Sequence, residues 1–74
     1  MMFIFVIRDG EEIITSRDTM NNAVAACMNR ISICGYLCEG FEYGEDITRI
    51  DYRDLPGHDS RTMVIERVRY KEGI

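Results

Sequence analysis

The sequence of 74 residues contains no tryptophan, one proline and one histidine, and it has no long hydrophobic run. A helix that crosses a membrane needs roughly 20 consecutive apolar residues, whereas the opening apolar run ends at Arg8. That run also lacks the basic start and the small-residue cleavage site of a signal peptide. There are three cysteines, an odd number. Together these features predict a protein of the reducing cytoplasm.

Basic residues are also fewer than acidic ones. Nine lysines and arginines stand against thirteen aspartates and glutamates, which gives a formal net charge of −4. A net negative chain argues against non-specific binding to nucleic acid as the main activity. With 46% hydrophobic and 30% charged residues, the composition is that of an ordinary globular chain. We therefore expect a single domain over residues 1–74.

The beginning of the chain predicts a β-hairpin. Strand-like runs at residues 3–8 and 11–17 flank Asp9-Gly10, a dipeptide that favours a two-residue turn because both central residues need positive φ. The register that follows pairs Arg8 with Glu11, Val6 with Ile13 and Phe5 with Ile14.

A helix is predicted over residues 18–34. Apolar residues recur there with a helical period and form one stripe. Asp18 or Thr19 is placed to cap its start, and Gly35 is placed to end it in the left-handed conformation. The stripe consists of Met20, Val24, Cys27, Met28 and Ile31.

Three further strands are predicted at residues 36–43, 47–55 and 61–70, with a turn containing Pro56 and Gly57 before the last. The order is β-β-α-β-β-β, or β-β-α-β-β if residues 36–43 are irregular. Such an order predicts a small α+β domain in which one helix packs on one face of a mainly antiparallel sheet.

The first hairpin is apolar on both of its faces. One helix covers only one face of a sheet, so the apolar residues of the other face are left open. A contiguous apolar patch on a small protein typically marks an interface, although single exposed hydrophobic residues are normal. Phe3, Phe5, Ile7 and Ile14 are expected under the helix, and Ile4, Val6 and Ile13 on the open face.

The cysteines lie close together in the sequence, at Cys27, Cys34 and Cys38. On one helix, Cys27 and Cys34 are about 10.5 Å apart along the axis, too far to bind one zinc ion, which holds two sulfurs within about 4 Å. Cys27 lies on the apolar stripe, where burial keeps a thiol neutral. We therefore expect core cysteines, no metal and no cofactor.

No catalytic constellation is predicted either. Residues 57–60 bring glycine, histidine, aspartate and serine together, but neighbouring residues do not reach the geometry of a hydrolase triad. A polar turn is the better interpretation, and we expect that the protein is not an enzyme.

Two charged stretches are candidate binding sites. An acidic stretch without basic residues is a candidate negative patch for a basic partner, or simply a solvated edge. Basic and aromatic residues alternate in the last two predicted strands, as in sheet-based RNA binders, although acidic residues are interleaved with them. The acidic stretch comprises Glu39, Glu42, Glu45 and Asp46, and the basic one comprises Arg49, Tyr52, Arg53, Arg67, Arg69 and Tyr70.

The leading hypothesis is a small interaction protein that binds another protein through its acidic stretch, its open sheet face or both. Regulatory adaptors and inhibitors, including those encoded by bacteriophages, have this size and charge. The open face also makes a homodimer a candidate. The alternative is an RNA- or DNA-binding module that uses the arginine-containing strands.

Overall fold

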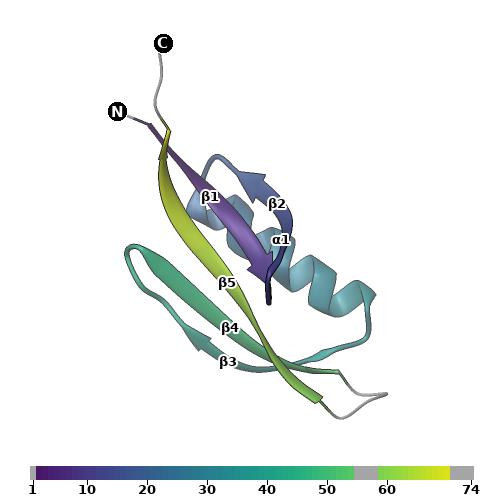
Figure 1. Ribbon diagram of the computed structural model, residues 1–74. Coiled ribbons are helices and arrows are strands. Elements are labelled where there is room, and N and C mark those ends of the chain that lie inside the picture. The colour runs from purple at the N-terminus through teal and green to yellow at the C-terminus, as the bar shows by residue number, and fades with distance from the viewer. Residues whose placement is uncertain (1, 55–58, 71–74) are drawn as a thin grey trace.

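In the computed structural model, which describes residues 2–54 and 59–70, one helix lies on one side of a five-stranded sheet (Figure 1). All neighbouring strands are antiparallel, in the order β2-β1-β5-β4-β3. The predicted α+β class is confirmed, and the segment around residues 36–43 does contain a strand. The elements are β1 (Met2–Asp9), β2 (Glu12–Arg17), α1 (Met20–Ile33), β3 (Leu37–Glu42), β4 (Ile47–Asp54) and β5 (Asp59–Tyr70).

The last strand, β5, is the centre of the sheet and with 12 residues is its longest strand. It pairs with β1 on one side and with β4 on the other. Alternate side chains of β5 point to opposite faces, so Met63 and Ile65 are buried while Val64 and Glu66 lie on the other face. One continuous strand thereby joins the hairpin β1–β2 to the hairpin β3–β4.

Local capping fixes both ends of α1. At the start, the Thr19 hydroxyl accepts a hydrogen bond from the backbone N–H of Asn22 at 3.1 Å. At the end, Gly35 adopts a φ of 72°, and the N–H of Tyr36 donates to the carbonyl of Ile31 at 2.9 Å. This is the Schellman arrangement, which satisfies carbonyls that the helix leaves free. Of the predicted caps, Thr19 and Gly35 are thus confirmed.

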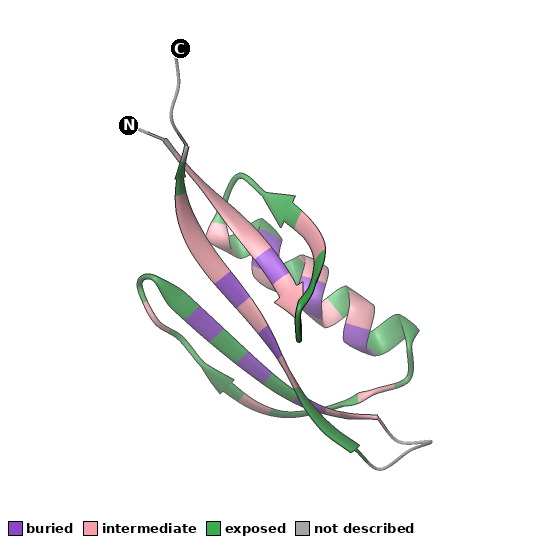
Figure 2. Ribbon diagram, in the orientation of Figure 1, coloured by how far each residue is buried: buried purple, intermediate pink, exposed green. Residues whose placement is uncertain are grey.

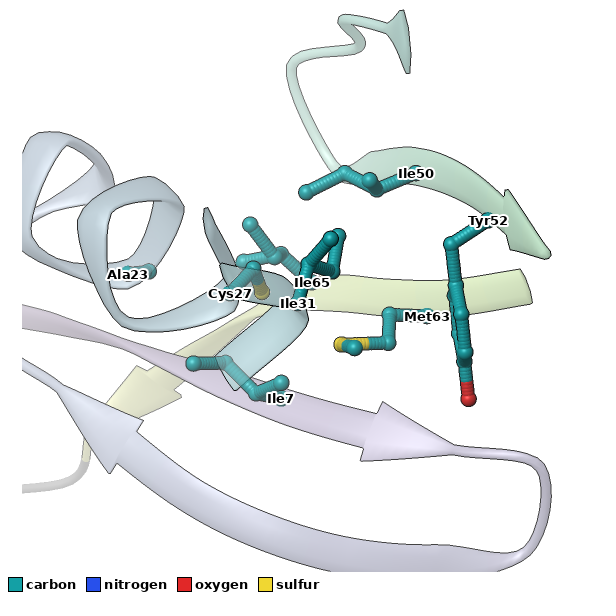
Figure 3. Packing of buried hydrophobic residues seen from close by; sticks show 8 residues of the cluster. All are labelled: Ile7, Ala23, Cys27, Ile31, Ile50, Tyr52, Met63 and Ile65. Atoms are coloured by element: carbon teal, nitrogen blue, oxygen red, sulfur yellow. The ribbon is translucent and has the colours of Figure 1, made fainter. Parts of the chain in front are cut away.

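The core lies between α1 and the sheet (Figures 2 and 3). The one buried polar side chain among the described residues, Thr48, is satisfied locally: its hydroxyl accepts from the N–H of Gly44 at 3.3 Å and donates to the Gly44 carbonyl at 3.1 Å. Hydrogen bonding of this kind is the normal condition of a buried polar group. The buried hydrophobic residues are Ile7, Ala23, Cys27, Ile31, Ile50, Tyr52, Met63 and Ile65.

The predicted register of the first hairpin is wrong. Asp9 pairs with Glu12 and Arg8 with Ile13, so the turn is centred on Gly10 and Glu11 and not on Asp9 and Gly10. Asp9 stays in the strand, where its carboxylate accepts a 2.6 Å hydrogen bond from the buried Tyr52 hydroxyl. The register is displaced by two residues at Ile13, so Ile13 keeps its predicted face because side chains alternate with period two. Beyond the shift between Ile7 and Arg8 the displacement is three residues, and Thr15 pairs with Ile7 on the helix side.

Strand β3 contains a bulge that the alternating pattern did not reveal. Cys38 pairs with Tyr52 and Gly40 pairs with Asp51, which leaves Glu39 as the extra residue. A bulge inverts the alternation beyond it. As a result Leu37, opposite Arg53, lies on the open side and Phe41, opposite the buried Ile50, lies on the helix side, although a regular strand would place both on one face.

Candidate functional site

The face of the sheet opposite α1, called the open face below, carries a set of aliphatic side chains. Ile4 and Val6 lie there because they alternate with the buried Ile7, and Ile13 lies beside them as the cross-strand partner of Arg8. The expected placement is therefore confirmed. Ile13 is 58% exposed, whereas Ile4 and Val6 are half-buried by their neighbours (Figure 2). The aliphatic residues of the open face are Ile4, Val6, Ile13, Leu37, Ile47, Val64 and Val68.

Charges of both signs lie between these aliphatic residues. Arg8 stands between Ile13 of β2 and Val64 of β5, while Glu66 stands between Val6 and Ile47. The two charged groups are 3.8 Å apart and each is about two-fifths exposed, at 40% and 42%. A pair this open and this long contributes little to stability, so both groups are available to a partner.

The other end of the open face is polar and already paired within the chain. Arg53 donates from Nε to the Glu39 carboxylate at 3.0 Å, and the Ser60 hydroxyl donates to the same carboxylate at 3.3 Å. In a neighbouring cross-strand pair of β4 and β5, the Thr62 hydroxyl donates to the Asp51 carboxylate at 2.7 Å. The open face is thus divided into an aliphatic end with loosely paired charges and a polar end with satisfied ones.

The structure divides the predicted acidic stretch. Glu42 lies opposite Arg49 in the register of β3 and β4. Beyond β3, the guanidinium of Arg67 binds Asp46 at 2.8 Å and Glu45 at 3.6 Å. With Glu39 paired to β4, the stretch does not form one uncompensated negative patch. Sequence reasoning missed this compensation because the arginines belong to strands whose register only the fold defines.

Arg67 is held from several directions. Its backbone N–H donates to the carbonyl of Asp46 at 2.8 Å, and its guanidinium lies 4.4 Å from the centre of the Phe3 ring. A cation above an aromatic face is attracted to the ring. Arg67 therefore links β5 to the β3–β4 turn and to β1.

The predicted nucleic-acid residues are not brought together on one surface. Tyr52 is fully buried and stacks on Tyr36, with ring centres 4.8 Å apart, so its ring is not available to a base. Arg67 lies on the helix side of β5, as its alternation with the buried Ile65 requires. The remaining residues are Arg49 and Arg53 on the open face, Arg69 on the helix side and Tyr70, whose side chain is outside the described part of the chain.

The three cysteines lie in different environments. All three are free, with Cys27 buried and Cys34 and Cys38 exposed. The expectation of core cysteines is therefore confirmed for Cys27 and wrong for Cys34 and Cys38, which lie at and beyond the end of α1 where no core covers them. Burial raises the pKa of the Cys27 thiol to about 11, partly opposed by the nearby Arg30 charge. Within residues 2–54 and 59–70, no three histidine, cysteine or acidic side chains gather as metal ligands. His58 falls outside these residues.

One polar cluster had no signal in the sequence. The Tyr52 hydroxyl donates to Asp9 from the inside of the sheet, and burial, followed by this hydrogen bond, raises the pKa of Tyr52 to about 12. A phenol with a raised pKa is a poor nucleophile at neutral pH. We interpret this cluster as a structural link between β1 and β4.

The only helix in the described part of the chain, α1, is too short to cross a membrane. Comparisons of the chain with family models, with curated proteins and with solved structures found no match.

Proposed function

We propose that this protein is a small, non-enzymatic interaction module that binds another protein through its open face and acts as a regulatory adaptor or inhibitor. The observation that supports this proposal is the aliphatic end of the open face, where Ile13 and Ile47 are 58% and 50% exposed beside Ile4, Val6 and Val68. None of the described elements covers it (Figure 1).

The dimensions of the sheet suit a protein partner. Four gaps of about 4.8 Å across the sheet and eight residues of about 3.3 Å along a strand give a flat area of about 500 Å². This is smaller than the roughly 800 Å² that each partner buries in a standard interface and is in the range of transient complexes. The partner surface that fits is apolar at its centre and carries both charge signs around it.

The acidic residues have a secondary place in this proposal. Glu39 and Glu42 lie at the β3 edge of the open face and serve as its rim. Glu45 and Asp46 are bound by Arg67 at the β3–β4 turn, so a partner has to compete with that arginine for them. We place the interaction in the cytoplasm, because three free cysteines, two of them exposed, suit a reducing compartment.

The test compares Val6→Asp with Asn21→Asp, a control that adds the same charge to an exposed position of α1. Sedimentation velocity measures self-association, and affinity capture followed by mass spectrometry identifies a different partner. We expect binding by the wild type and by the control, and its loss in Val6→Asp with an unchanged circular dichroism spectrum. The proposal is wrong if no association of either kind occurs, or if Val6→Asp binds as the wild type does.

A further inference from the structure

A second surface lies on the other side of the sheet, in a groove between α1 and the edge strand β2. Its deeper part has a volume of about 360 Å³ and continues into a shallower hollow along the helix. Ala25 and Ala26 line the helix wall, and Thr15 and Arg17 line the strand wall. The small alanine side chains leave room between the two elements.

The position of the groove suits an extended chain. Strand β2 is at the edge of the sheet and pairs only with β1 among the described strands, so its outer backbone N–H and C=O groups are unpaired. Such an edge is a template for one more strand. A peptide that pairs with β2 lies beside Ala26 and Asn29 of α1, which line the groove. Strand addition to an exposed sheet edge is an established way of binding an extended peptide.

The charge of the groove selects the kind of peptide. Arg17 and Arg30 line its deeper part, and no acidic side chain of the described residues lines it, although the whole chain has a net charge of −4. Arg17 is held in place by donating to the Thr15 hydroxyl at 2.5 Å and to the Ser16 carbonyl at 2.8 Å. Two positive charges in one groove favour a carboxylate ligand.

Arg30 provides an independent observation. Its Nε atom is buried and has no hydrogen-bond partner, and Arg30 forms no ion pair with any described carboxylate. Buried unpaired donors are rare in folded proteins, and each one calls for an explanation. A ligand carboxylate at the guanidinium supplies the missing charge partner.

We infer that the groove between α1 and β2 binds an extended acidic segment of a partner protein, which adds to β2 as a further strand and places a glutamate or aspartate side chain on Arg30. This inference is independent of the open face, which lies on the opposite side of the sheet.

The experiment selects linear decapeptides from a random phage-displayed library on the immobilised wild-type protein and on Arg30→Gln. Arg49→Gln is the matched control, because it removes one arginine from the open face. We expect the wild type and Arg49→Gln to select acidic peptides rich in β-branched residues, and Arg30→Gln to lose that selection.

The most enriched peptide is then synthesised with blocked ends, so that its only carboxylates belong to side chains. It is titrated into isotope-labelled protein, and binding is followed by NMR. We expect at least tenfold weaker binding to Arg30→Gln and to Arg17→Gln, unchanged binding to Arg49→Gln, and changes in NMR amide shifts concentrated in β2. The inference is overturned if no acidic peptide is selected, if Arg49→Gln weakens binding as much as Arg30→Gln, or if the shifts fall on the open face.

Discussion

The hydrogen bond between Tyr52 and Asp9 allows a sharp test of how the sheet is held together. Its 2.6 Å length and the full burial of Tyr52 indicate a strong interaction with a carboxylate, worth about 1.5–3 kcal/mol. Tyr52→Phe removes the hydroxyl and keeps the ring that stacks on Tyr36. We therefore expect the free energy of unfolding to fall by about 2 kcal/mol, out of roughly 4–11 kcal/mol for a domain of this size. The corresponding fall in Tm is about 8–16 °C.

Urea unfolding followed by circular dichroism measures this loss. Tyr43→Phe is the control, because that side chain is 66% exposed and removing its hydroxyl leaves the core intact. A double-mutant cycle with Asp9→Asn isolates the pair, and we expect a coupling of about 1 kcal/mol or more. If Tyr52→Phe is as stable as Tyr43→Phe, or if the coupling is zero, the hydrogen bond does not have the role assigned to it.

Alkaline pH is expected to destabilise the fold, because burial raises the pKa of Cys27 from 9.0 to about 11 and that of Tyr52 from 10.0 to about 12. The unfolded chain releases these protons first, so the free energy of unfolding is constant up to about pH 9 and falls as the pH rises through 11 and 12. Chemical denaturation between pH 8 and pH 12 measures how steeply the free energy of unfolding falls with pH. Cys27→Ala should make this fall shallower between pH 9 and 11. If the variant and the wild type fall equally steeply, the raised pKa of Cys27 is refuted. Gly35→Ala is expected to cost about 1 kcal/mol through its φ of 72° alone, since space is free around it. Gly44→Ala should cost more in the same unfolding assay, because the new Cβ collides with the backbone oxygen of Ile47; equal losses would contradict this.

Local signals were sufficient for the elements and for the faces of the first hairpin. Thr19 and Gly35 mark the ends of α1 through interactions within a few residues, and alternation in β1 separates Ile7 from Val6. The strand order could not be predicted, since nothing local states that β5 lies between β1 and β4. For the same reason the sequence did not predict that Arg67 binds Asp46 of the acidic stretch, which lies 21 positions earlier in the chain.

The errors share one physical cause, which is that a distant contact decides a local choice. Asp9-Gly10 favours a turn, yet Asp9 belongs to the strand because Tyr52, 43 positions along the chain, donates to its carboxylate. The bulge at Glu39 likewise depends on contacts with Arg53 and Ser60. Sequence reasoning also missed the groove beside β2, because a groove is defined by two elements whose spacing the sequence does not state.

The irregularity in β2 explains how one short strand contributes to both proposed surfaces. Ile13 pairs with Arg8 on the open face, but the register shifts after it, so that Thr15 pairs with Ile7 on the helix side. In a regular strand Ile13 and Thr15 would share a face. The extra residue in between, Ile14, packs against the core and turns Thr15 and Arg17 toward α1. The bulge therefore gives β2 an aliphatic contact on one side of the sheet and a cationic groove on the other, and a partner at one surface leaves the other accessible.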